Sequence, residues 1–270
     1  MLVRKPKFIN DDVPYFDLEQ IESRLDLVEL SDEFVIRPDT VYVASLAHAV
    51  NMEGKRYYTA MIGINGRCIL TTCKSNDLIS EYSKRSLTSP RFWHWVARRL
   101  GWKPLHFAGE NSFVPESTPS WGQTSWIGSR WYDSIYTTSK ATFVTFTQPQ
   151  TQWQVIVRVH ICKRKLLKKL AQVRAMLIYT HQLTQWAIEQ WLPSSHVDLV
   201  VPANLPEIPG LRLPLWSAWQ IRQFIFANHD EDVCYIATDE CCSTIHEATE
   251  RAQYAWFPPR ELIKARRQPS

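Results

Sequence analysis

One stretch, from about Cys162 to Tyr179, constrains the fold of this chain more than any other. Its apolar residues recur at intervals of one, three and four positions, which places them on one face of an amphipathic helix. These residues are Leu166, Leu167, Leu170, Val173 and Leu177. A second helical pattern, or a continuation of the first, reaches Leu192 before Pro193.

The remaining surface of this predicted helix is basic. It carries Lys163, Arg164, Lys165, Lys168, Lys169 and Arg174, and no acid. Without acids the helix cannot form internal i,i+4 ion pairs, so the bases repel one another unless an anion is bound. The pattern therefore predicts contact with a polyanion, and the alternative is the solvated face of an ordinary packed helix.

Charge is segregated along the whole chain, although the net charge is only +4. Residues 10–39 hold ten acids and two bases, whereas residues 84–174 hold fifteen bases and three acids. Acids are dense again over residues 230–250. A basic middle segment of this kind is typical of a polyanion-facing surface. The alternative is that the acidic ends fold over the basic middle and neutralise it.

A second basic patch is predicted on a helix over residues 91–100, with Pro90 at its first position and Gly101 as its stop. One helical face presents Arg91, Trp95, Arg98 and Arg99, and Lys103 follows the helix. Arginines beside an exposed tryptophan bind phosphates and stack on bases. Alternatively, the tryptophan belongs to the core and the arginines are ordinary surface residues.

Elsewhere the pattern predicts a mixture of helices and strands. Residues 12–30 have helical spacing, and residues 40–50 fit a short helix or a strand. The dipeptide Asn65-Gly66 between two apolar runs predicts a hairpin. Two further strands are expected at 142–147 and 153–161, and a long loop is expected at 103–130.

These elements predict an α+β fold, with mixed strands and helices and a helical C-terminal part. The α+β domain with the basic helices spans residues 1–192, a proline-rich linker spans 193–214, and a small helical segment spans 215–270. Only 8 glycines and no phosphate-binding loop argue against a nucleotide cofactor, so no cofactor is predicted. No apolar run reaches the roughly 18 residues of a membrane span. The N-terminus lacks the apolar core of a secretory signal, and a cytoplasmic protein with reduced thiols is expected.

Two patterns that hold metals elsewhere are weak here. Cys68 and Cys73, or Cys241-Cys242 with His246, lack the four well-spaced ligands of a structural zinc site, so no metal site is predicted. The nuclease pattern PD-(D/E)xK is matched by Asp39, Glu53 and Lys55. Such a nuclease would use the carboxylates to hold a divalent ion and the lysine near the attacking water.

The run from Cys68 and Cys73 through Leu87-Thr88-Ser89-Pro90 to Trp95 resembles the N-terminal region of the large subunit of type IV CRISPR effector complexes. The strand and basic helix over 153–177 follow in a similar order. The family's second cysteine pair is absent, because aromatic residues occupy the region from Phe92 to Trp95. The resemblance implies a protein of antiviral defence that contacts guide RNA and the duplex next to the target without catalysis of its own.

The sequence therefore favours a non-catalytic, nucleic-acid-binding subunit of a multi-protein complex. Its expected partners are RNA, DNA or both, together with other protein subunits, and no membrane. Two alternatives stay open. One is a protein–protein adaptor that binds no nucleic acid, and the other is the divalent-metal nuclease.

Overall fold

The fold of the chain, in a computed structural model, is α+β, as the sequence predicts. The structure describes residues 12–19, 21, 28–32, 35–84, 97, 100–102, 111–117, 123–191 and 201–210. All of them belong to the first of two compact units, Met1–Leu213, and the second unit is Pro214–Ser270. The predicted helix at 91–100, apart from Ala97 and Leu100, and the predicted C-terminal helices lie outside the described residues.

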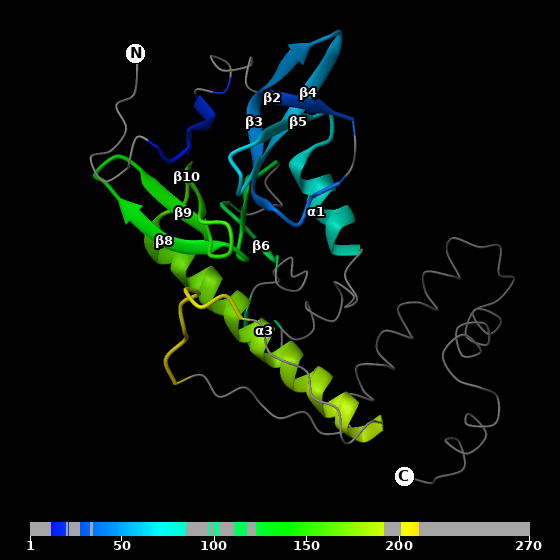
Figure 1. The fold of residues 1–270 in the computed structure, drawn as a ribbon, viewed down its shortest axis with the longest axis vertical. Coiled ribbons are helices and arrows are strands. Elements are labelled where there is room, and N and C mark those ends of the chain that lie inside the picture. Colours follow the sequence, from blue (N-terminus) through cyan, green and yellow to red (C-terminus); the bar gives the residue numbers. More distant parts are fainter. Residues whose placement is uncertain are drawn as a thin grey trace, which may run out of the picture. The chain divides into compact units, whose positions relative to one another are not determined.

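The larger sheet has six strands, in the order β2-β5-β4-β3-β7-β6 (Figure 1). Its members are β2 (Val28–Ser31), β5 (Cys68–Thr71), β4 (Lys55–Gly63), β3 (Thr40–Met52), β7 (Trp126–Gly128) and β6 (Phe113–Pro115). Neighbouring strands are antiparallel except β2 and β5, which pair in parallel. Helix α1 (Ser75–Lys84) follows β5.

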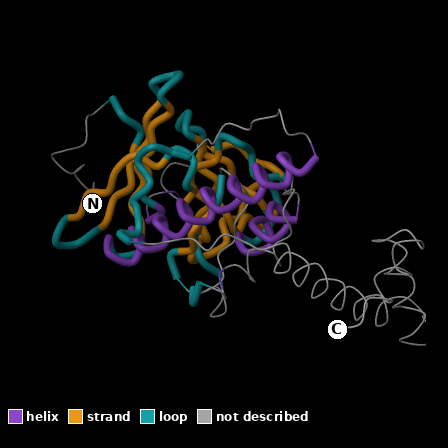
Figure 2. The backbone as a smooth tube through the Cα atoms, turned by 90° about the horizontal axis from the view of Figure 1, so that it is seen from below, coloured by secondary structure: helices purple, strands orange, loops and turns teal. Residues whose placement is uncertain are grey.

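The smaller sheet has four strands, in the order β1-β10-β9-β8. They are β1 (Tyr15–Phe16), β10 (Trp153–Val159), β9 (Thr142–Gln148) and β8 (Tyr132–Thr137). Helix α3 (Lys163–Trp191) begins four residues after β10 and runs across the strands, as Figure 2 shows. Alternate β10 residues Val155, Val157 and Val159 are buried, so one face of this sheet belongs to the core.

The hairpin expected at Asn65-Gly66 is confirmed. Strands β4 and β5 pair antiparallel, and the Gly63 amide donates to the Arg67 carbonyl at 2.9 Å. Gly66 has a φ of 81°, which a glycine adopts without the steric cost of a side chain. The local turn chemistry thus sets the register of two central strands.

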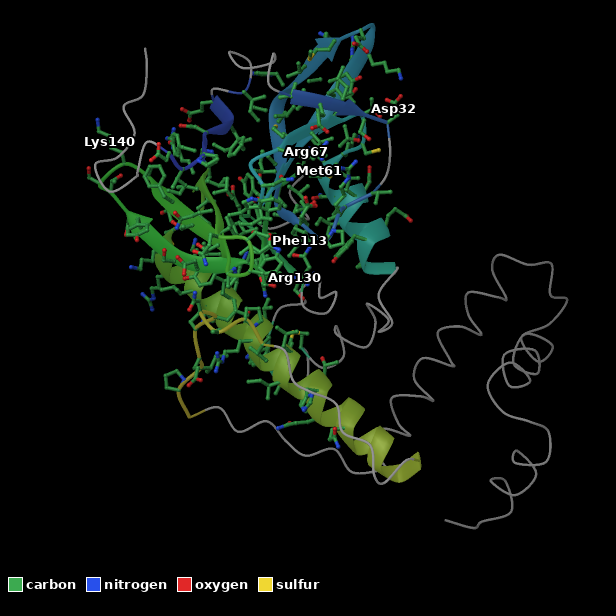
Figure 3. The ribbon with its side chains drawn as sticks, viewed as in Figure 1. Asp32, Met61, Arg67, Phe113, Arg130 and Lys140 are labelled. Carbon is green, nitrogen blue, oxygen red and sulfur yellow. The ribbon has the colours of Figure 1, made fainter. Side chains whose placement is uncertain are left out.

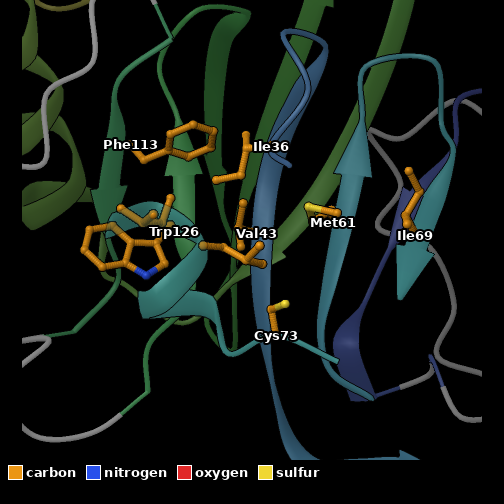
Figure 4. Packing of buried hydrophobic residues seen from close by; sticks show 9 residues of the cluster. Ile36, Val43, Met61, Ile69, Cys73, Phe113 and Trp126 are labelled. Atoms are coloured by element: carbon orange, nitrogen blue, oxygen red, sulfur yellow. The ribbon is translucent and has the colours of Figure 1, made fainter. Parts of the chain in front are cut away.

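The hydrophobic core of the six-stranded sheet lies between the sheet and α1 (Figure 4). It comprises Ile36, Val43, Met61, Ile69, Cys73, Leu78, Ile79, Phe113 and Trp126. The Trp126 indole N–H donates to the Asn76 side chain at 3.2 Å, so the one polar atom of this buried ring has a partner on α1. This contact orients the ring between β7 and the helix.

Two expectations about the first half of the chain are wrong for the residues that the structure describes. The stretch 12–30, with helical spacing, contains β1 and β2, each of which pairs in parallel with a strand later in the chain. The stretch 103–130, expected to be a loop, contains β6 and β7. Strands β1, β2 and β7 each pair with a strand that is distant in sequence, and β6 pairs with β7, so local spacing does not report these short strands.

The strands at 142–147 and 153–161 and the helix from about 162 are confirmed as β9, β10 and α3. The helical pattern up to residue 192 is a continuation of the first helix rather than a second one. Part of the predicted linker, residues 201–210, belongs to the first unit. Leu205 is buried there, and the Asn204 side chain donates to Asp133 at 2.7 Å.

Truncation of Trp126 tests the core. We expect Trp126→Ala to lower the free energy of unfolding by about 3–5 kcal/mol, because a ring that is 1% exposed leaves a cavity. The matched control is Trp153→Ala, which removes a ring that is 47% exposed and is expected to cost less than about 1 kcal/mol. Urea denaturation measures both, and equal losses would contradict this description of the core.

Candidate functional site

Four bases at the start of α3 form an exposed surface, here called the basic face: Lys163, Arg164, Lys165 and Lys168. On a helix of 3.6 residues per turn, Arg164, Lys165 and Lys168 fall within an arc of about 100°. Leu166 and Leu170 lie on the opposite side and are fully buried. The burial of this apolar stripe points Arg164, Lys165 and Lys168 to solvent, and Lys163, the first residue of the helix, is exposed as well.

The basic face stands at the end of α3 where the helix dipole is positive. Its first turn holds no acid and three consecutive bases. Like charge at this end costs a few tenths of a kcal/mol or more per residue, whereas a bound anion reverses the sign of the interaction. The helix thus begins in a way that favours an anionic partner.

The other two bases predicted on this helix have partners within the protein. The Lys169 ammonium donates to the Pro115 carbonyl. The Arg174 guanidinium donates to the Leu205 carbonyl at 3.1 Å and pairs with Glu207. Both residues therefore fix α3 to neighbouring segments, and four of the six predicted bases stay on the exposed surface.

Acids from the N-terminal part neutralise bases elsewhere in the protein. Lys55 pairs with Asp32, and Arg67 with Glu29. Asp32 and Arg67 are labelled on the six-stranded sheet in Figure 3. Within the described part of the chain, no carboxylate pairs with the basic face. Neutralisation by the acidic N-terminal region thus occurs, but at other positions.

The most buried of these ion pairs joins β10 to the segment after β1. Arg158 donates to Asp17 at 2.9 Å and to Glu19 at 2.9 Å. The Asp17 side chain has no exposed surface, whereas Glu19 is 61% exposed. Because a fully buried carboxylate needs its partner, Asp17 is the structural member of this group.

Glu116, directly after β6, is a carboxyl that sequence reasoning did not single out. Its Oε1 accepts from the Tyr42 hydroxyl at 2.8 Å and from the His160 backbone N–H at 3.2 Å. Burial raises the pKa of Glu116, and these two donors together with the nearby His160 and Lys169 side chains lower it by less. Glu116, one of the three acids among residues 84–174, therefore contacts the backbone three residues before α3 begins.

The cysteines singled out in the sequence lie in the core. Cys68 and Cys73 are both buried as free thiols, and burial raises the pKa of Cys68 to about 12. No group of three or more potential metal ligands occurs among the residues that the structure describes. Cys241, Cys242 and His246 lie outside them.

The structure does not bring together the residues that match the PD-(D/E)xK nuclease pattern. Asp39 precedes β3, whereas Glu53 and Gly54 form the turn after it, with φ of 49° and 76°. A strand of this length separates the two carboxylates by on the order of 30–40 Å. Lys55 is paired with Asp32. These residues cannot share one metal ion.

The second predicted patch, formed by Arg91, Trp95, Arg98, Arg99 and Lys103, lies outside the described residues. No described helix is long and apolar enough to cross a membrane.

Comparison with known proteins adds no relative: no family model, no curated protein and no solved structure matches this chain.

Removal of Asp17 tests the ion pair with Arg158. We expect Asp17→Ala to lower the free energy of unfolding by roughly 1–3 kcal/mol, because Arg158 loses its buried partner. Glu19→Ala is the matched control on the same guanidinium, and an exposed pair of this kind contributes about 0–1 kcal/mol. Urea denaturation of both variants checks this order, and a larger loss in Glu19→Ala would overturn it.

The raised pKa of Glu116 predicts that the stability of the protein depends on pH. A carboxyl whose pKa is higher in the folded protein binds its proton more tightly there, so its contribution is full below the unfolded pKa. That contribution is lost as the pH rises through the folded pKa. We expect Glu116→Gln to show a smaller loss of stability over this rise than the unmodified protein. Thermal unfolding in a pH series from 4.5 upward measures it, and parallel curves would contradict the prediction.

Proposed function

We propose that this protein binds the phosphate backbone of a nucleic acid through the basic face of α3, as a non-catalytic subunit of a larger nucleoprotein complex. One observation carries the proposal: four adjacent bases are exposed at a helix start, without a carboxylate partner in the described part of the chain. Nucleic acids are the polyanions with closely spaced phosphates that such a cluster matches.

The basic face suits backbone contact rather than the reading of bases. Lysines act as flexible point charges, and Arg164 adds a planar fork for one phosphate. Neutralising phosphates releases condensed counterions, so affinity depends on salt more than on sequence. Contacts of this type position a protein on a strand without selecting a sequence.

The finer proposal follows the resemblance to the large subunit of type IV CRISPR effector complexes. In such a setting the ligand is guide RNA or the duplex next to the target, and other protein subunits complete the binding surface. The burial of Cys68 and Cys73 removes the first cysteine pair from this comparison, because both thiols pack in the core. The order of strand and basic helix over residues 153–177 is what supports it.

Neutralising the basic face tests the proposal. We expect the combined variant Lys163→Gln, Arg164→Gln, Lys165→Gln and Lys168→Gln to lose most of its affinity for single-stranded RNA at low salt. The slope of log affinity against log salt should fall by about 3, since each neutralised phosphate contributes about 0.7 on a single strand. Fluorescence anisotropy with labelled RNA and, separately, labelled duplex DNA measures both quantities.

The matched control neutralises three exposed bases elsewhere: Arg56→Gln, Lys74→Gln and Lys140→Gln. It should change the slope by less than about 1. If the α3 variant keeps the affinity and salt slope of the unmodified protein, the basic face is not the contact. If the unmodified protein binds neither polymer at low salt, the proposal fails and a protein–protein adaptor becomes the better description.

A further inference from the structure

Glu116 lies where the two sheets and α3 come together. Its Oε1 is shared by the Tyr42 hydroxyl of β3, in the six-stranded sheet, and the His160 backbone N–H after β10, in the four-stranded sheet. Its own backbone N–H donates to the Ser125 carbonyl, just before β7, at 2.9 Å. One side chain therefore links segments that are far apart in sequence.

Two contacts at this junction flank the basic face in the sequence, one before its first base and one after its last. His160 precedes Lys163 by three residues, and Glu116 fixes its backbone. Lys169 follows Lys168, and its ammonium donates to the carbonyl of Pro115, the neighbour of Glu116. The two anchors bracket the four exposed bases, so residues 115–116 set how α3 presents them.

From this geometry we infer that Glu116 is a positioning residue whose charge regulates the basic face: the neutral carboxyl permits tight nucleic-acid binding and the ionised carboxylate weakens it. The inference rests on the proposed function and adds its regulation by pH. Both forms of the carboxyl accept the two hydrogen bonds, so the helix start stays anchored while its electrostatic surroundings change.

The sign follows from the groups around the carboxyl. Lys169 and His160 face it from the α3 side, and Tyr42 faces it from β3. Asp17, whose charge also raises the pKa of Tyr42, forms an ion pair with Arg158. Burial raises the pKa of Glu116, so its ionisation falls at a higher pH than that of an ordinary glutamate. Ionisation of Glu116 adds a negative charge at the backbone three residues before Lys163, which lowers the affinity of the nearby basic face for a polyanion.

The test is the pH profile of binding to single-stranded RNA at fixed salt. The unmodified protein should lose roughly two- to four-fold in affinity as the pH rises through the ionisation of Glu116. Glu116→Gln keeps a side-chain oxygen acceptor but cannot ionise. We expect it to retain the high affinity across the whole series, whereas loss of a merely structural contact would weaken binding at every pH.

Tyr42→Phe supplies a second, independent readout. It removes the hydroxyl that donates to the carboxylate, and this donor lowers the pKa of Glu116. The midpoint of the binding profile should therefore move to higher pH while its amplitude is kept. A purely structural junction predicts no such shift.

The control is His160→Gln, which leaves the backbone donor in place and removes the imidazole. The fall in affinity should persist in this variant, with its midpoint at slightly higher pH, because the imidazole lowers the pKa of Glu116. Suppose that Glu116→Gln reproduces the pH profile of the unmodified protein, while the variant with all four bases of the basic face replaced by Gln still abolishes binding. The inference is then overturned and the proposed function stands. If the variant with four replaced bases has no effect either, the proposed function itself is overturned.

Discussion

The burial of one stripe on α3 decides which way its charges point. Leu166, Leu170 and Val173 are completely enclosed, so rotation of the helix about its axis would expose apolar surface and bury bases. Each buried leucine contributes on the order of 2 kcal/mol, which exceeds the repulsion among the surface charges. The electrostatic character of this surface is thus a consequence of packing on the opposite side.

The acids near the N-terminus compensate some of the bases and leave others exposed. The acids near the N-terminus neutralise Arg67, Lys55 and Arg158, so part of the basic content of the chain is internally compensated. Among the described residues, no carboxylate pairs with the four bases at the start of α3. Net charge alone did not distinguish the two situations, because the sum is the same whichever bases are paired.

Sequence reasoning succeeded where the determinant was local. The Asn65-Gly66 hairpin follows from turn chemistry, and the helical period identified the apolar face of α3. It failed for β1 and β2, whose partners are parallel strands elsewhere in the chain. The role of Glu116 could not be predicted either, because it depends on hydrogen bonds from Tyr42 and His160, which are distant from it in the sequence.

The parallel pairing of β1 with β10 has a consequence for the order of assembly. Asp17 and Arg158 are 141 residues apart, so this edge of the four-stranded sheet closes only after β10 has left the ribosome. The β4–β5 hairpin, by contrast, joins neighbouring segments and can form early. During synthesis, Asp17 and Glu19 therefore stay without their Arg158 partner while the central hairpin folds, and β1 is among the last strands to reach its final position.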